Sequence, residues 1–149
     1  MIVLGIDTSD YANTLGVVDD AGVLSGLEHP ARSNSIESII TDIEGVLKKA
    51  NISLNDIQGI GVGLGPGSWT GIRIGVTVGK MLAFSTGKPV AGISTLKALA
   101  YGIDGKGRTI FSVIDVGTKD TVYAAQYRNE NGHLEQTGDY YVGDIKGFG

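Results

Sequence analysis

One segment, residues 59–80 (GIGVGLGPGSWTGIRIGVTVGK), constrains the fold of this chain more than any other. It opens with an apolar run, Gly59–Leu64, which predicts a buried strand, and Gly65-Pro66-Gly67 then supplies a turn. Ser68 or Thr70 can cap the helix that we expect next. The segment therefore predicts a strand–turn–helix unit, which is typical of an α/β fold.

Glycines recur at every fourth position of this expected helix. At 100° per residue, Gly71, Gly75 and Gly79 lie along one side, where the absence of side chains allows close packing. The opposite side carries polar, basic and aromatic residues: Arg73, Thr77, Lys80 and Phe84. Two interpretations stay open, because the glycines can seat the helix on its own sheet or form a helix–helix interface with another protein. Under the second, we expect Gly75→Leu to abolish pairing and to leave the fold largely intact.

Upstream of this segment, the sequence predicts an antiparallel meander of three strands. The expected strands are Ile2–Asp7, Thr14–Val18 and Val23–His29. The first two are separated by a polar turn. Asp19–Gly22 predicts a tight hairpin between the second and third, because Asp and Gly tolerate the backbone angles that such a turn requires.

A long amphipathic helix is expected after the meander, over Ser33–Ala50. Its apolar residues recur at spacings of three and four: Ile36, Ile39, Ile40, Ile43, Val46 and Leu47. Asn34 and Glu37 have the spacing of a capping box at its start. Because an apolar strand follows this helix, we expect a crossover connection to a parallel position in a mixed sheet.

A short strand over Lys88–Gly92 and a third helix, capped by Ser94, complete the first part of the chain. The predicted order is thus βββαβαβα. The glycine-rich, charged stretch 103–108 then marks the expected boundary between an N-terminal domain, 1–104, and a second domain, 105–149.

The second domain repeats the opening pattern. Thr109–Asp115 matches Ile2–Asp7, since both end in Ile-Asp, and strands over Thr121–Arg128 and Leu134–Val142 follow. We therefore expect a duplicated unit whose second copy is an incomplete lobe, a three-stranded meander without a covering helix. We also expect the chain to be truncated at its C-terminus or divergent there.

Composition argues against several classes of protein. Net charge is −4 without a basic cluster, which disfavours unaided binding of nucleic acid. The chain has no cysteine, so disulfides and thiolate metal sites are excluded. No apolar run approaches the roughly 20 residues of a membrane span, and the N-terminus does not resemble a signal peptide. We expect a cytoplasmic protein with no membrane association.

Two aspartates at strand ends are candidates for degenerate phosphate loops. Asp7, followed by Thr8 and Ser9, could organise Mg²⁺ and phosphate, and Asp115 would mark the matching second loop. A minimal actin-like ATPase or phosphotransferase that uses Asp7 and Asp115 with Mg-ATP is therefore an alternative hypothesis. We favour the plainer interpretation, in which these aspartates cap turns.

Other nucleotide and catalytic templates do not match. The P-loop and dinucleotide spacings fail in the glycine-rich segment, and Ser68 is not in a nucleophile elbow. His29 and His133 fall in or near the third strands of the two meanders, so neither predicts a catalytic triad with Ser68.

The combination of IDTS at the N-terminus with GPGSWTGIRIG at Gly65–Gly75 resembles the TsaB family. The resemblance covers the N-terminal lobe, and STLKALA at Ser94–Ala100 and the strand that contains Tyr123 also fit it. It implies an actin-like (ribonuclease H-like) fold of two related lobes.

The resemblance also implies a function. TsaB is the non-catalytic paralogue of TsaD, which it binds and activates for threonylcarbamoyl transfer to N6 of adenosine 37 in ANN-decoding tRNAs. The implied partners are TsaD, a TsaE-type ATPase in a larger complex, tRNA only indirectly, and a second copy when TsaD is absent. No cofactor is implied for the chain alone, with ATP and Mg²⁺ only in the complex. The family has also been classed with glycoprotein endopeptidases, but no residue here supplies protease chemistry.

The family pairs with TsaD through its first two helices. The expected interface residues are Ile36, Ile39, Ile40, Ile43, Leu47, Gly71, Arg73, Gly75, Val76, Gly79, Lys80 and Phe84. The catalytic paralogue has two metal-binding histidines at places that match Asn34 and Ser38, which implies no metal centre here. Asp115-Val116-Gly117 stands where the family has Asp-Ala-Arg, which weakens the expectation of a ligand or RNA contact in the second lobe.

Overall fold

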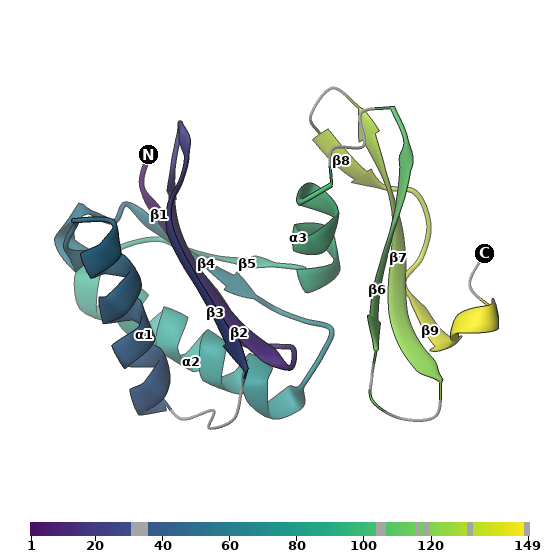
Figure 1. Ribbon diagram of the computed structural model, residues 1–149, viewed down its shortest axis with the longest axis horizontal. Coiled ribbons are helices and arrows are strands. Elements are labelled where there is room, and N and C mark those ends of the chain that lie inside the picture. The colour runs from purple at the N-terminus through teal and green to yellow at the C-terminus, as the bar shows by residue number, and fades with distance from the viewer. Residues whose placement is uncertain (31–35, 104–106, 116, 118–119, 131–132, 148–149) are drawn as a thin grey trace. The chain divides into compact units, whose positions relative to one another are not determined.

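The computed structural model describes residues 1–30, 36–103, 107–115, 117, 120–130 and 133–147. The chain divides into two compact units, Met1–Ile93 (unit 1) and Ser94–Gly149 (unit 2), and Figure 1 shows the elements of each. Within the described residues, no helix is both long and apolar enough to cross a membrane.

The described residues of unit 1 form one mixed sheet of five strands. Its elements are β1 (Val3–Asp7), β2 (Ala12–Asp19), β3 (Gly22–Pro30), α1 (Ile36–Lys49), β4 (Gly59–Gly63), α2 (Trp69–Thr86) and β5 (Val90–Ile93). The strand order is β3-β2-β1-β4-β5. The first three strands are antiparallel, and β4 and β5 continue the sheet in parallel with β1. The predicted meander, crossover and βββαβαβ order of this unit are confirmed.

Helices α1 and α2 pack on the same face of this sheet (Figure 1). Alternate residues of the strands point toward them, because successive side chains of a strand point to opposite faces. The shared core contains Leu4, Ile6, Leu15 and Val17 from the antiparallel strands, Ile60 and Val62 from β4, Ile39, Ile43, Val46 and Leu47 from α1, and Val78, Leu82 and Ala83 from α2. Both helices follow the carboxyl end of a strand and return to a parallel strand, so they run in the same direction.

Local signals in the sequence set several element ends. The Asp19 carboxylate accepts hydrogen bonds from the backbone N–H groups of Ala21 (2.8 Å) and Gly22 (3.0 Å), which confirms the predicted hairpin. Ser68 caps α2, since its hydroxyl oxygen accepts from the Gly71 N–H at 3.2 Å. Ser94 caps α3 (Thr95–Tyr101) in the same way. The predicted capping box of α1 rests on Asn34, which lies outside the described residues.

The described residues of unit 2 form a sheet of four strands and one α-helix. Its elements are α3 (Thr95–Tyr101), β6 (Thr109–Asp115), β7 (Thr121–Glu130), β8 (His133–Gln136) and β9 (Tyr141–Asp144). The order is β6-β7-β8, and β9 also pairs with β7. The single strand expected over Leu134–Val142 is therefore two, because the chain leaves the sheet at Thr137–Tyr140, where the Gln136 side-chain amide donates to the Gly138 carbonyl oxygen.

The division between the units precedes the boundary expected from the sequence. Leu96 and Ala100 of α3 are fully buried in a core with Ile110 and Tyr127, so α3 belongs with the second sheet. The sequence placed α3 in the first domain because its amphipathic pattern does not show which sheet it covers. The expected boundary itself, between residues 104 and 105, lies outside the described residues.

Candidate protein-interaction site

The glycine stripe of α2 faces the sheet of unit 1. A Cβ atom on Gly71 would overlap the backbone carbonyl oxygen of Thr8, and one on Gly75 would lie 2.5 Å from the Thr8 hydroxyl oxygen. A Cβ on Gly79 would overlap a methyl group of Val62. The interpretation that the stripe seats α2 on its own sheet is therefore correct. This packing does not support a role of the glycines as partner contacts, and we now expect Gly75→Leu to disturb the fold, because the new side chain would meet Thr8.

Several expected interface residues of α1 also belong to the core. Ile39, Ile43 and Leu47 are 0%, 3% and 7% exposed, because their side chains pack against the strands. This burial argues against Ile39 as a partner contact, whereas Ile43 and Leu47 still line a hollow beside α1. Ile40 and, on α2, Val76 are half-buried at the edge of this core, so they stay candidates only at the margin of an interface.

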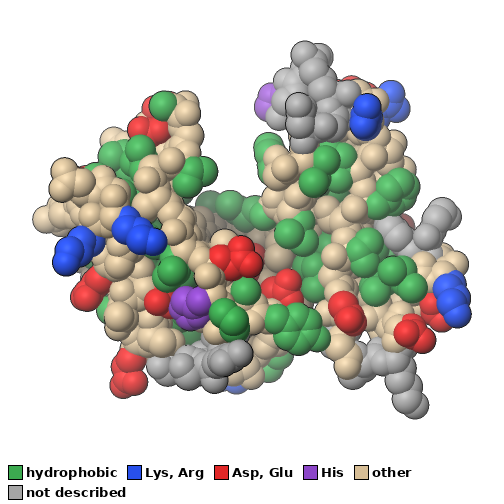
Figure 2. Space-filling view, in the orientation of Figure 1, with side chains coloured by type: hydrophobic (Ala, Val, Ile, Leu, Met, Phe, Trp, Pro, Cys, Tyr) green, Lys and Arg blue, Asp and Glu red, His purple; other side chains and the backbone are tan. Residues whose placement is uncertain are grey.

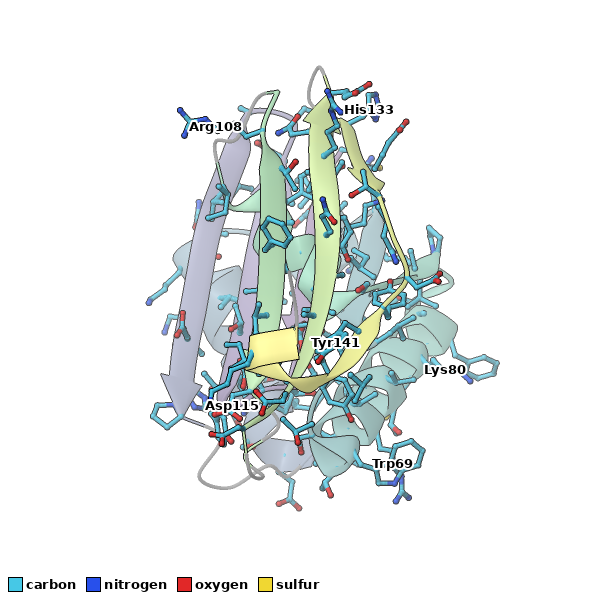
Figure 3. The ribbon with its side chains drawn as sticks, turned by 90° about the vertical axis from the view of Figure 1, so that its right-hand side faces the viewer. Trp69, Lys80, Arg108, Asp115, His133 and Tyr141 are labelled. Atoms are coloured by element: carbon cyan, nitrogen blue, oxygen red, sulfur yellow. The ribbon has the colours of Figure 1, made fainter. Side chains whose placement is uncertain are left out.

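The outward side of α2 exposes large apolar residues. Phe84 is 92% exposed and Trp69 is 73% exposed, while Met81 and Ile36 of α1 are about half exposed. Trp69 and Lys80 point away from the strands in Figure 3. Sequence analysis missed Trp69 and Met81, although both fall on the helical face that carries Phe84, so the spacing could have identified them.

Two separate hollows lie along α1 and α2. The one near the amino ends of the helices has a volume of about 260 Å³ and is lined by Ile36, Thr70, Arg73, Ile74 and Thr77. The other lies near their carboxyl ends, has a volume of about 610 Å³ and is lined by Ile40, Ile43, Glu44, Leu47, Lys48, Asn51, Ile52, Ser53, Leu54, Asp56 and Leu82. We call the surface that contains these hollows and the exposed side of α2 the α1/α2 face.

Exposed apolar residues are not confined to this face. Hydrophobic side chains reach the surface of both units (Figure 2), including Val23 on the edge strand β3. On the second sheet, Phe111 and Val142 are more than half exposed. The α1/α2 face differs because it also contains the two hollows, one of which is lined by Ile36.

The turn Asp7–Ser9 is occupied by contacts within the chain. The Thr8 hydroxyl donates to the Gly71 carbonyl oxygen at 2.6 Å, and the Ser9 hydroxyl and N–H donate to Asp7 Oδ1 at 2.6 and 2.9 Å. The Ser68 N–H donates to the Ser9 carbonyl oxygen at 2.6 Å. Thr8 and Ser9 are both 1% exposed. The turn therefore holds the first turn of α2 against β1, which is the turn-capping role favoured from the sequence.

Asp115 ends β6 in unit 2, away from Asp7 in the chain and in a separate unit. Its carboxylate is exposed and accepts a hydrogen bond from the Gly117 N–H at 2.7 Å (Figure 3). Val116, which follows it in the sequence, lies outside the described residues. Asp115 thus also caps a turn.

A histidine–aspartate pair, His29 and Asp42, joins β3 to α1. His29 Nε2 lies 2.7 Å from Asp42 Oδ2, and Nδ1 lies 3.1 Å from the Pro30 carbonyl oxygen. Both partners are acceptors, so both ring nitrogens donate only in the imidazolium form. The Pro30 carbonyl and then Asp42 raise the pKa of His29 above its ordinary value. Among the described residues, no three His, Asp or Glu side chains cluster as a metal site would require.

The family model for TsaD, described as tRNA N6-adenosine threonylcarbamoyltransferase, matches residues 29–145. The chain belongs to the TsaB/TsaD family. The TsaB protein of Escherichia coli K12, named for tRNA threonylcarbamoyladenosine biosynthesis, is 34% identical over 141 residues, which cover 92% of this chain and 61% of that protein. TsaB of Bacillus subtilis 168 is 34% identical over 142 residues, covering 91% and 59% respectively. The chain thus spans about three-fifths of the length of these relatives.

A solved structure supports the same assignment. YeaZ from Pseudomonas aeruginosa superposes with a TM-score of 0.80 at 26% identity, over 95% of this chain and 66% of that one. Together with the β3-β2-β1-β4-β5 sheet, this match confirms the actin-like α/β fold that the resemblance implied.

Proposed function

We propose that this chain is a non-catalytic subunit that binds a TsaD-type partner through the α1/α2 face. In this proposal it activates the partner for transfer of a threonylcarbamoyl group to N6 of adenosine 37 in tRNAs that read ANN codons. The observation that carries the proposal is the exposure of Trp69, Met81 and Phe84 on α2, on a face that also contains the two hollows. Large exposed apolar side chains gathered on one face are typical of a protein-interaction surface.

We propose that the chain is not itself catalytic. The turn Asp7–Ser9, which resembles a phosphate loop in sequence, supports this part of the proposal. The Thr8 hydroxyl is used by Gly71 and the Ser9 hydroxyl by Asp7, and both side chains are buried. Phosphate binding there would require these bonds to break. We therefore propose that the chain needs no cofactor of its own and that ATP and Mg²⁺ bind only in the assembled complex, together with a TsaE-type ATPase.

The proposal also covers self-association, contact with tRNA and location in the cell. Because the α1/α2 face is apolar, a second copy can cover it when the partner is absent, which gives a homodimer. Contact with tRNA is indirect, through the partner. A cytoplasmic location fits this role.

Co-purification with the TsaD-type protein of the same organism, followed by a tRNA-modification assay, tests the proposal. We expect a stoichiometric complex, and threonylcarbamoyl transfer that requires both proteins. The chain alone should transfer nothing to tRNA. A partner that is fully active without this chain, or that does not co-purify with it, would contradict the proposal.

A further inference from the structure

Asn13 of β2 is a buried polar residue whose side chain has no partner among the described residues. It is 1% exposed, and neither its amide nitrogen nor its amide oxygen takes part in a hydrogen bond there. Its side chain points to the helix-covered face of the sheet, because Asn13 alternates with the core residues Leu15 and Val17. A buried amide without partners costs stability, so its presence requires a physical explanation.

His29 of β3 lies directly opposite Asn13. The register of β2 and β3 pairs the two residues, and opposite residues of antiparallel strands have their Cβ atoms about 4.5–5.5 Å apart. The His29 ring lies on the same face as Asn13, since its Nε2 contacts Asp42 of α1. Rotation about its side-chain bonds therefore lets the ring reach either Asp42 or Asn13.

The charge of the His29 ring determines which of these partners suits it. Both ring nitrogens now face acceptors, Asp42 Oδ2 at 2.7 Å and the Pro30 carbonyl oxygen at 3.1 Å, so each nitrogen must carry a hydrogen. A neutral ring has one nitrogen without a hydrogen, and that nitrogen needs a donor. The Asn13 amide nitrogen is an unused donor on the neighbouring strand.

We propose that His29 is a pH-sensitive switch that exchanges Asp42 for Asn13 when the ring loses its proton. In acid the imidazolium binds Asp42 and attaches α1 to the edge strand β3. In base the ring gives its proton to water, which its 36% exposed side chain can reach, and then turns to accept a hydrogen bond from the Asn13 amide. The second form uses the amide that the first form leaves unpaired.

The charges around His29 agree with a single titrating switch. Asp42 is the charged group of α1 that acts on the ring, and β2 faces it with Asn13, which does not ionise. Glu28 precedes His29 on β3 and points to the other face of the sheet. The Pro30 carbonyl and then Asp42 raise the pKa of His29, so the exchange is centred above pH 6.5.

The switch acts on the α1/α2 face through the first half of α1. Asp42 ends that half, and one turn further on the Ser25 hydroxyl donates to the Val46 carbonyl oxygen at 2.7 Å. Loss of the Asp42 contact therefore releases the amino-terminal half of α1 while the other half stays attached to β3. The released half carries Ile36, which lines the hollow near the amino ends of the helices. This step rests on the proposed function, because a partner on this face should prefer the acid form.

NMR spectroscopy of the histidine rings and of the Asn13 side-chain amide tests the exchange in the free chain. As the pH rises from 5.5 to 8.5, the Asn13 amide signals should shift with the same midpoint as the His29 ring. The second histidine, His133, is exposed on β8, and its ring signals serve as the reference. Asn13 signals that stay unchanged while His29 titrates would overturn the exchange.

The affinity for the TsaD-type partner tests the coupling. Wild type should bind about fivefold more tightly at pH 5.5 than at pH 8.5, which is the lower end of common coupling strengths. Asn13→Leu removes the alternative partner and His29→Gln removes the titrating ring, so in each variant the two affinities should differ less than about twofold. His133→Gln is the matched control and should keep the wild-type ratio. Circular dichroism verifies that each variant is folded.

The outcomes separate this inference from the proposed function. A wild-type affinity that is equal at both pH values, or a wild-type ratio that persists in Asn13→Leu and His29→Gln, would overturn the coupling and leave the proposed function standing. Absence of binding at both pH values would count against the proposed function, and the NMR titration would still decide the exchange.

Discussion

The two sides of helix α2 differ in their residues and in what those residues contact. One side packs on the chain's own sheet, and the other is exposed. The inward side includes, besides the core residues Val78, Leu82 and Ala83, glycines that contact the turn Asp7–Ser9 and strand β4 so closely that a Cβ atom would overlap them. The outward side carries Trp69, Met81 and Phe84, which contribute nothing to the core of unit 1. In the sequence the glycines are the more conspicuous feature. The comparison teaches that the glycine stripe determines where α2 sits, and it leaves the outward residues Trp69, Met81 and Phe84 free to serve the binding that we propose.

The close packing of α2 on the sheet also explains why the turn Asp7–Ser9 carries polar side chains. Thr8 touches α2 at both Gly71 and Gly75, and its hydroxyl gives the Gly71 carbonyl oxygen a hydrogen bond in addition to those of the helix. A turn that resembles a phosphate loop in sequence is here part of the packing of a helix. Substitutions on the two sides of α2 should therefore separate stability from binding.

Gly71→Ala should have the largest effect on stability. Its methyl group would overlap the Thr8 carbonyl oxygen, which belongs to the backbone and cannot turn away. We expect a loss of about 3 kcal/mol or more in the free energy of unfolding, measured by urea denaturation. Gly45→Ala, on α1, has open space around the added methyl group and is the matched control, which should not destabilise the protein. Equal stability of the two variants would show that the inward side of α2 is not closely packed.

Thr8→Val should have the next largest effect. It keeps the shape of the side chain but removes the 2.6 Å hydrogen bond to the buried Gly71 carbonyl oxygen. We expect a loss of about 1–2 kcal/mol, measured in the same way. Thr77→Val changes an exposed threonine on the outward side of the same helix and should cost less than about 0.5 kcal/mol. If both variants cost the same, the Thr8 bond does not hold α2.

A smaller, pH-dependent effect is expected where α1 meets β3. The pKa of His29 is raised in the folded state by the Pro30 carbonyl and by Asp42, so its contribution to stability is complete below the unfolded pKa of about 6.5. That contribution is lost as the pH rises through the folded pKa. Urea denaturation at pH 5.5 and pH 8.5 should therefore show a drop in stability that is smaller in His29→Gln. A variant with the same pH dependence as wild type would show that the His29–Asp42 pair does not stabilise α1.

The smallest effect on stability should come from the outward side itself. Phe84 is 92% exposed, so Phe84→Asp removes almost no buried apolar area. We expect the free energy of unfolding to change by less than about 0.5 kcal/mol. A larger loss in thermal or urea denaturation would mean that Phe84 packs against its own chain.

Much of the fold follows from short-range signals in the sequence. The Asp19 hairpin, the Ser68 cap and the alternating apolar strands act over a few residues, so their positions could be predicted. The break between β8 and β9 falls at Thr137-Gly138-Asp139, a turn-like run that was included in one expected strand, Leu134–Val142. Whether α3 belongs to unit 1 or unit 2 likewise depends on which sheet its apolar side packs against.

The site was predictable only in part, for the same physical reason. An apolar stripe on a helix shows that one side of the helix is buried. It does not show whether that side packs against the chain's own sheet or against another protein. Ile39 and Gly75 are covered by their own unit, and Phe84 is not. The two hollows depend on how α1, α2 and the segment after α1 are placed in space, which no single element encodes alone.

The affinity of Phe84→Asp for the TsaD-type partner is the most direct test of the account, with Val23→Asp as its control. Val23 is also exposed and apolar, at 75%, but it lies on the edge strand β3. The account predicts that Phe84→Asp binds about 30-fold more weakly than wild type, as loss of an interface hot spot would, and that Val23→Asp binds like wild type, with both variants folded. Wild-type affinity in Phe84→Asp would contradict the central claim that the outward side of α2 holds the partner.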